Sequence, residues 1–150
     1  MRILLQRVTQ ASVSVDQKVV GSIERGYLLF IGVMQGDTEE QALWLARKIS
    51  ALRLFDGEDG KINDLNILDI VGEAIVVSQF TLAGDFKKGN RPDYTSAASP
   101  DEANKLYEYF IDALRKEGIQ NVQSGTFGAI MQVSLTNDGP VTLCLERTSS

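Results

Sequence analysis

The sequence contains no histidine and a single cysteine, and both scarcities restrict the chemistry of the protein. Histidine is the usual general base at neutral pH and a common zinc ligand, so its absence removes both roles together. One cysteine cannot form a disulfide within the chain, and Cys144 lies in an apolar run where we expect it to pack in the core. Any catalysis must therefore proceed without an imidazole.

Long apolar runs and an excess of positive charge are also missing. No stretch approaches the ~18 apolar residues of a membrane span, and Arg2 and Arg7 interrupt the first segment too early for a signal peptide. We therefore expect a cytoplasmic protein with no membrane partner. The net charge of −5 argues against broad binding to a polyanion, so any contact with RNA must be local. The acidic residues near position 58 lack a complete calcium-loop pattern, and we expect neither a cofactor nor a catalytic metal.

The pattern of the remaining residues predicts a fold class. The length fits one domain covering residues 1–150. Alternating apolar and polar positions between residues 2 and 34 predict strands of an antiparallel meander. Residues 75–82 predict another strand, and two more, near 129–135 and 141–146, flank a Gly-Pro turn. We expect an α+β fold, a mainly antiparallel, barrel-like sheet with two main amphipathic helices packed on it.

Both helices have recognisable starts. Asp37 or Thr38 can cap the first, in which apolar residues recur at helical spacing. Ser99 and Pro100 are typical of the cap and first position of the second helix, and Gly118 supplies a left-handed stop. The apolar positions are Leu43, Ala46, Ile49 and Leu52 in the first helix, and Ala103, Leu106, Phe110, Ala113 and Leu114 in the second.

A stretch without periodicity, residues 83–94, separates the predicted strand from the second helix. It is longer than most connections in compact domains, and long ordered loops usually carry function. Lys87, Lys88 and Arg91 concentrate positive charge there. The stretch is either a solvated surface loop or a contact for RNA phosphate, and the sequence leaves both readings open.

Two short motifs carry most of the functional information. One reads Ser-Gln-Phe-Thr-Leu at residues 78–82, at the end of a predicted strand. The other reads Asn-Asp-Gly-Pro-Val-Thr at residues 137–142. Together with the segments 6–13, 53–55 and 125–129, they resemble the signatures of the D-aminoacyl-tRNA deacylase (D-tyrosyl-tRNA deacylase) family nearly end to end. The resemblance implies a hydrolase that binds the acceptor 3′ end of D-aminoacyl-tRNA, cleaves its ester bond and releases the D-amino acid and tRNA.

The resemblance also assigns a chiral filter to Gly139 and Pro140. In that family the Gly-Pro bond is cis, and the motif reaches into the pocket of the other subunit of a homodimer, where its carbonyls exclude an L side chain. Rejection by clash does not depend on which side chain is present, so glycine should pass. We therefore expect glycyl-tRNA mischarged on tRNA(Ala) to be cleared too. Asn137 belongs to the same motif, and Arg7 either braces the Gly-Pro segment or lies on the surface.

The first motif supplies the candidates for catalysis. Thr81 is either a covalent nucleophile or a positioning hydroxyl, and the lack of an adjacent base favours positioning. The backbone N–H of Phe80 is our candidate donor to a developing oxyanion. Ser78 and Gln79 bind the substrate's amino group or adenosine, or merely satisfy backbone groups at the strand end. The attacking group is then water or the adjacent ribose hydroxyl, as the family's substrate-assisted mechanism implies.

Two other classes of function stay open at this point. A noncatalytic module that binds the tRNA acceptor end would also use the basic loop, but it would protect the ester without turnover. A structural β-rich interaction domain would show no dependence on tRNA. Neither alternative explains the presence of both motifs.

Overall fold

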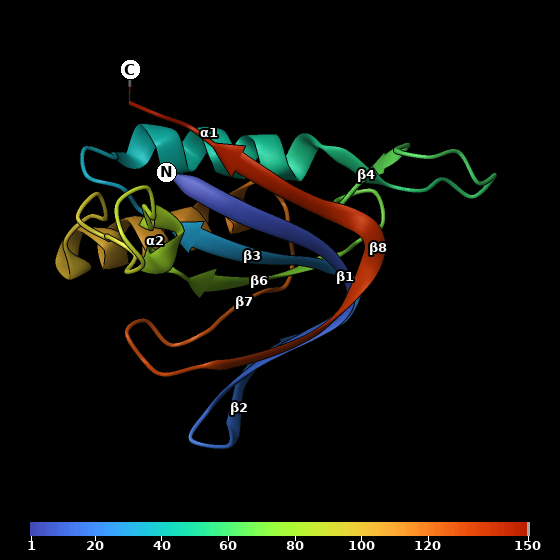
Figure 1. Ribbon diagram of the computed structural model, residues 1–150. Helices are drawn as coiled ribbons and strands as arrows, with labels where there is room; N and C mark the ends of the chain where they lie inside the picture. The colour runs from blue at the N-terminus through green and yellow to red at the C-terminus, as the bar shows by residue number, and fades with distance from the viewer. Residues whose placement is uncertain (150) are drawn as a thin grey trace.

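The computed structural model describes residues 1–149, and its chain forms a strongly curved sheet with two α-helices (Figure 1). No helix in this part of the chain is long and apolar enough to cross a membrane. In chain order the elements are β1 (Arg2–Val15), β2 (Lys18–Ile23), β3 (Gly26–Gly32), α1 (Glu39–Ala51), β4 (Arg53–Phe55), β5 (Leu65–Asn66), β6 (Glu73–Ser78), the 3-10 helix η1 (Phe80–Ala83), α2 (Pro100–Lys116), β7 (Val122–Ser124) and β8 (Gln132–Glu146).

Strand β1 organises the main sheet because it pairs antiparallel with three other strands. β8 follows one edge of β1 along nearly its whole length. β3 and β2 share the other edge, β3 along the first half of β1 and β2 along the second. β6 and β7 continue the sheet from β3 in parallel. The sheet bends near the middle of β1 and approaches a barrel, which confirms the predicted fold class; the two parallel pairs were not predicted (Figure 1).

Both predicted helices form with the caps that the sequence indicated. Thr38 caps α1 and takes part in a capping box with Gln41. Ser99 accepts a hydrogen bond from the backbone of Glu102 at the start of α2, and Gly118 follows its end with a φ of 114°. Leu52 lies just beyond α1, so the predicted stripe is one position too long. The apolar residues that α1 buries are Ala42, Leu45, Ala46 and Ile49.

The two faces of the sheet have separate cores. Alternate residues of β3 point to opposite faces, so Leu29 packs under the helices while Leu28 packs on the other face. Phe110 of α2 is fully buried against the helix-side core, and burying such a ring contributes roughly 1.5–3 kcal/mol. Gly26 lies so close to β6 that a Cβ at this position would stand 1.7 Å from the Glu73 carbonyl oxygen. Close contact of β3 with β6 therefore requires glycine there.

The strand predicted over residues 75–82 ends at Ser78, and this part of the prediction is wrong. β3, the neighbour of β6, ends at Gly32, so the chain has no partner along which to continue. The backbone N–H of Leu82 instead donates to the Gln79 carbonyl (3.2 Å) and closes η1. A Cβ at Gly32 would lie 2.8 Å from the Leu82 Cβ, so a side chain there would exclude η1 from this position.

The predicted turn at Gly139-Pro140 is also wrong, because β8 is one continuous strand. Asn137 and Thr142 both pair with β1, on either side of Arg7. The residues between them, 138–141, form a bulge in β8, and the Gly139-Pro140 peptide bond within it is cis. A bulge keeps both halves of the strand paired while its extra residues stand out from the ladder.

Cys144 is exposed, which corrects the expectation that it packs in the core. Successive side chains of a strand point to opposite faces, and Leu143 and Leu145 take the half-buried face. Within residues 1–149, the outer edge of β8 has no paired strand. Cys144 therefore points to the opposite face, where its side chain is exposed.

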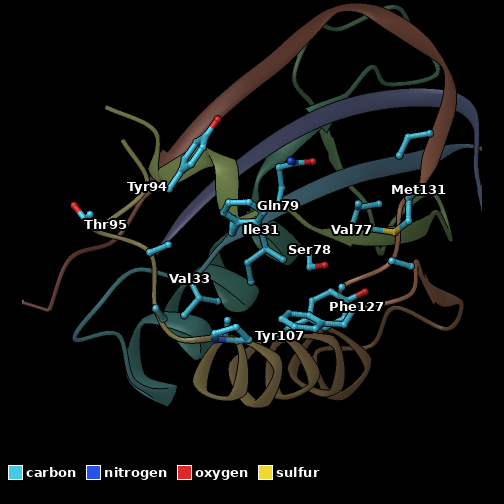
Figure 2. Close-up of a pocket in the computed structure, with 18 residues that line it drawn as sticks. Ile31, Val33, Val77, Ser78, Gln79, Tyr94, Thr95, Tyr107, Phe127 and Met131 are labelled. Atoms are coloured by element: carbon cyan, nitrogen blue, oxygen red, sulfur yellow. The ribbon is translucent and has the colours of Figure 1, made fainter. Parts of the chain in front are cut away.

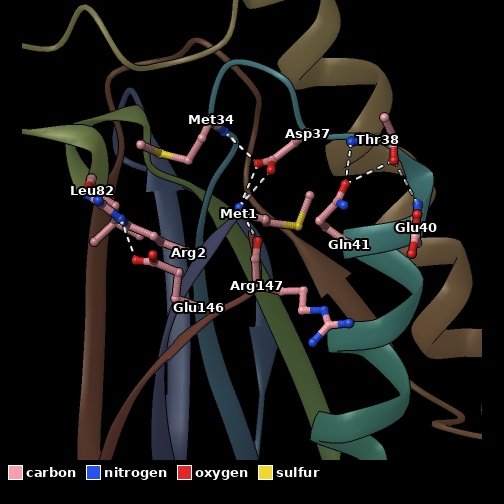
Figure 3. Close-up of polar contacts among 10 residues, drawn as sticks. All are labelled: Met1, Arg2, Met34, Asp37, Thr38, Glu40, Gln41, Leu82, Glu146 and Arg147. Atoms are coloured by element: carbon pink, nitrogen blue, oxygen red, sulfur yellow. Dashed lines mark hydrogen bonds and ion pairs between the residues drawn. The ribbon is translucent and has the colours of Figure 1, made fainter. Parts of the chain in front are cut away.

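The N-terminus ties η1 to the end of β8 (Figure 3). Arg2 Nη1 donates to the Leu82 carbonyl oxygen (2.8 Å), and Arg2 Nε contacts a Glu146 carboxylate oxygen (2.9 Å). Beside it, the α-ammonium group of Met1 donates to a buried Asp37 carboxylate oxygen (2.8 Å). These contacts fix the start of β1 against the segment that carries the first motif.

Candidate active site

A cavity of about 680 Å³ opens where β3 and β6 end beside α2 (Figure 2). Tyr107 and Phe127 form one wall next to α2, and Met131 lies at the other side. Most of the lining is apolar. Among the described residues that line it there is no aspartate, glutamate, lysine or arginine. The cavity can therefore enclose an uncharged group, but it offers no side chain with a formal charge at neutral pH.

The first motif lies at this cavity. Ser78, Gln79 and Phe80 line it, the first two with half-buried side chains (Figure 2). Thr81 lies next to them without lining the cavity, and its hydroxyl oxygen accepts a short hydrogen bond from the Gln79 side-chain amide. The structure thus brings four of the predicted site residues together around the end of β6.

Two backbone donors at this corner are free. The N–H of Gln79 donates to the Ile31 carbonyl (2.8 Å), and the next backbone donor in use is that of Leu82. Within residues 1–149, the N–H groups of Phe80 and Thr81 have no acceptor. The first N–H groups of any helix lack a partner inside the helix, and η1 begins at Phe80. The fold therefore leaves two adjacent donors available beside the cavity.

Tyr107 is the buried titratable group of the cavity wall. Its hydroxyl donates to the Val76 carbonyl oxygen (2.9 Å). Burial raises the pKa of Tyr107 above its ordinary value, so the phenol stays protonated at neutral pH. It is therefore a fixed donor in the wall and is unsuited to act as a base.

The second motif surrounds Arg7, which is only 7% exposed. Arg7 Nε donates to the Asp138 carbonyl oxygen (3.1 Å) and lies 3.3 Å from the Asp138 carboxylate. Arg7 Nη1 donates to the Leu54 carbonyl oxygen (2.6 Å). The Asn137 amide donates to the backbone carbonyls of Arg7 (2.9 Å) and Val141 (3.2 Å), across the base of the bulge. Gly139 and Pro140 themselves are exposed.

Within one chain the two motifs do not meet. Neither Gly139 nor Pro140 lines the cavity. Ser78 of β6 lies opposite a residue of β3 that itself lies opposite Ile3 of β1. The bulge of β8 lies opposite Arg7 of β1. From the usual spacings of a sheet, Ser78 and the bulge lie roughly 13 Å apart along the strand direction and about 14 Å apart across the strands. The predicted site residues therefore form two groups in the single chain.

Sequence reasoning missed part of the cavity wall. Tyr107 falls on the buried stripe of α2, between Ala103 and Phe110, so the helical spacing could have found it. Phe127 and Met131 come from the segment between β7 and β8. Phe127 carries no periodic signal, and Met131 falls within the strand predicted near 129–135, which begins only at Gln132. Their place in the wall depends on how that segment folds back over β6.

These features fit an active site that encloses an uncharged group beside free backbone donors. A sequence model of the D-Tyr-tRNA(Tyr) deacylase family matches residues 4–146. The chain is 53% identical over 146 residues to a D-aminoacyl-tRNA deacylase of Thermotoga petrophila, covering 97% of each protein. It is 54% identical over 149 residues to one of an Exiguobacterium species, covering 99% of this chain and 100% of the relative. The chain belongs to this family of D-aminoacyl-tRNA deacylases, which are hydrolases.

Two solved structures share the fold of this chain. A protein described as c-Myc DNA unwinding element binding protein superimposes with a TM-score of 0.93 at 39% identity, over 99% of this chain and 100% of the other. A probable eukaryotic D-amino acid tRNA deacylase superimposes with a TM-score of 0.83 at 20% identity, over 96% and 97% of the two chains. At that identity the second likeness shows the shared fold alone.

Proposed function

We propose that the protein hydrolyses the ester bond between a D-amino acid and the 3′ end of tRNA, with residues 1–150 acting as one domain. The observation that carries this proposal is the cavity of the first motif, which combines an apolar enclosure with two free backbone N–H groups. The products are free D-amino acid and reusable tRNA. The reaction needs no cofactor, and we propose that it takes place in the cytoplasm.

In this proposal the Phe80 N–H stabilises the negative oxygen that forms when the ester carbonyl is attacked. A preorganised donor of this kind contributes about two to three orders of magnitude in rate. Thr81 positions the site: its hydroxyl accepts a hydrogen bond from Gln79, which leaves the hydroxyl hydrogen free to orient toward substrate. Ser78 and Gln79 bind the substrate's amino group or its adenosine from the cavity wall.

The attacking group then comes from solvent or from the substrate. No charged side chain lines the cavity, and Tyr107 holds its proton, so the described wall contains no general base for neutral pH. Water, or the ribose hydroxyl next to the ester, supplies the nucleophile. The ester is activated enough for donors and orientation to carry the remaining acceleration.

The chiral filter acts between two subunits. Gly139 and Pro140 are exposed, and they lie away from their own chain's cavity. In a homodimer, the bulge of one subunit reaches the cavity of its partner, and its carbonyls exclude an L side chain by clash. Arg7 and Asn137 hold the bulge through the hydrogen bonds at its base. Glycine has no side chain to exclude, so glycyl-tRNA mischarged on tRNA(Ala) is also a substrate.

The first experiment measures release of amino acid from D-tyrosyl-tRNA and L-tyrosyl-tRNA side by side, against spontaneous hydrolysis. Catalytic cleavage of the D form alone supports the proposal. Protection of both esters without turnover supports a noncatalytic binding module instead, and no effect on either supports a structural domain.

A subunit-mixing experiment tests the action in trans. Gly139→Ala adds one methyl group to the exposed bulge, where among residues 1–149 its one close neighbour is the Asn137 side-chain oxygen at 3.3 Å. We expect this variant to fold normally yet lose activity, because the added methyl group would enter the partner's cavity and take up room that the substrate needs. Gln79→Ala should lose activity through its own cavity. Heterodimers of the two should regain activity, because one of their two sites combines an intact cavity with an intact bulge. An active monomer in sedimentation, or mixed dimers that stay inactive, would contradict action in trans.

A further inference from the structure

The segment between η1 and α2 contains a closed basic loop, residues 85–93. The backbone N–H and carbonyl groups of Asp85 and Asp93 exchange two hydrogen bonds of 2.8 Å, which join the ends of the loop. The two aspartates also accept bonds from backbone N–H groups, Asp85 from Lys87 (3.0 Å) and Asp93 from Thr95 (2.8 Å). The bond from Thr95 lowers the pKa of Asp93. The loop thus has defined ends, and its acidic side chains are engaged at those ends.

The cations of the loop are free. Lys87, Lys88 and Arg91 are all exposed, and within residues 1–149 none of them lies within 4.0 Å of an acidic side chain. The loop contains three cations and two aspartates, so its net charge of +1 is a local reversal of sign in a chain whose net charge is −5. A region of this kind attracts an anionic partner without making the whole surface attractive to polyanions.

The loop stands at the entrance of the cavity. Tyr94 and Thr95, which directly follow it, line the cavity (Figure 2). The Tyr94 ring packs edge-on against the Phe80 ring, with centroids 5.3 Å apart. The residues from Lys87 to Arg91 can span at most about 17 Å, so their cations can face only neighbouring phosphates of a nucleic-acid strand.

We propose that the basic loop binds backbone phosphates of the acceptor stem, so that it draws the tRNA end into the cavity. This inference rests on the proposed function, because it takes the occupant of the cavity to be the aminoacylated end of tRNA. The loop then governs affinity for the RNA body, whereas the cavity governs the chemistry at the ester. Separate substrates can therefore distinguish the two roles.

The test compares a loop variant with a control of equal charge. The loop variant combines Lys87→Gln, Lys88→Gln and Arg91→Gln. The control combines Lys18→Gln, Lys61→Gln and Lys116→Gln, three exposed lysines that do not line the cavity. Each protein is assayed on D-tyrosyl-tRNA and on D-tyrosyl-adenosine, which keeps the ester and lacks the acceptor stem. Binding of uncharged tRNA is measured between 50 and 200 mM salt as the test conditions.

Each lost phosphate contact removes about 0.7 to 0.9 from the slope of log affinity against log salt. If the loop variant lacks three phosphate contacts, the affinity of the wild-type protein for tRNA should fall about 20- to 40-fold more between 50 and 200 mM salt than the affinity of the loop variant. We expect the loop variant to lose kcat/KM on D-tyrosyl-tRNA through a raised KM, to keep wild-type activity on D-tyrosyl-adenosine, and the control to resemble wild type on both.

Two outcomes would overturn the inference separately from the proposed function. If the loop variant and the control show the same salt slope and the same KM for D-tyrosyl-tRNA, the loop does not bind the stem, although the deacylase remains. If the loop variant loses activity equally on D-tyrosyl-adenosine, the loop acts on the cavity and not on RNA. A wild-type protein inactive on both esters would contradict the proposed function itself.

Discussion

Replacing Arg7 with methionine tests whether its guanidinium group holds the bulge of β8. Methionine keeps much of the volume and removes every donor. Hydrogen bonds from a charged donor contribute about 1.5–3 kcal/mol each, so the bonds to the Leu54 and Asp138 carbonyls together give about 3–6 kcal/mol. The Asp138 carboxylate is 38% exposed and regains water, and the cost of burying the guanidinium disappears. We expect a net loss of about 3 kcal/mol in unfolding free energy.

Guanidinium chloride denaturation with an unchanged m-value measures this loss directly. For a chain of this length, 3 kcal/mol corresponds to a fall of about 6–12 °C in Tm. Arg53→Met is the matched control, because Arg53 is exposed and lies in β4 beside Leu54. We expect the control to stay within about 0.5 kcal/mol of wild type, as is usual for surface substitutions.

The same variant also tests selectivity. A bulge without its buried anchor positions Gly139 and Pro140 less well, so we expect the ratio of kcat/KM for D-tyrosyl-tRNA over L-tyrosyl-tRNA to fall at least about 10-fold, or roughly 1.4 kcal/mol. The reasoning is refuted if Arg7→Met unfolds no more easily than Arg53→Met and keeps the wild-type ratio. The guanidinium group would then not stabilise the bulge.

Three further changes have defined outcomes. Thr81→Ala should retain measurable activity, reduced about 5-fold because the variant loses one neutral hydrogen bond with Gln79. Complete loss of activity in a folded variant that still binds substrate would support a nucleophilic role for Thr81. Gly26→Ala should yield little folded protein, because its Cβ would overlap the Glu73 carbonyl, and a native circular dichroism spectrum would contradict this. Tyr27→Phe should leave stability unchanged or raise it by about 1 kcal/mol, since the buried Tyr27 hydroxyl has no partner within residues 1–149. Burial raises the pKa of Tyr27 above its ordinary 10, so above pH 10 the unfolded chain ionises this phenol while the folded protein keeps it protonated. Stability therefore falls as pH rises above 10, and denaturation at pH 9 and 11 should show a smaller alkaline loss in Tyr27→Phe.

The helices could be predicted because their signals are local. The Ser99 cap and the stripe of α2 lie within one segment, and no distant residue is needed to interpret them. The change from strand to η1 could not be predicted in this way. It depends on where β3 ends and on the room that Gly32 leaves for Leu82, and both belong to another part of the chain.

In the site, too, some features could be predicted from local sequence, whereas others depend on distant parts of the chain. The residues of the first motif could be named from their pattern, but the free N–H groups of Phe80 and Thr81 follow from η1, which the sequence did not indicate. The Gly-Pro segment resembled a turn because glycine and proline favour turns. Its continuity within β8 depends on pairing with β1 and on contact with Arg7, which lies 131 positions from Asp138 in the chain.

The place of Arg2 and Arg7 on one strand limits how proteins with this fold can change in length. Arg2 holds η1 from one face of β1, and Arg7 holds the bulge of β8 from the other. Inserting a single residue between them would shift the two contacts apart and turn one arginine to the wrong face of the sheet. Loops such as residues 56–64 carry no such restriction. Over evolution, insertions and deletions should therefore accumulate in those loops, while the number of residues separating the two arginines stays constant.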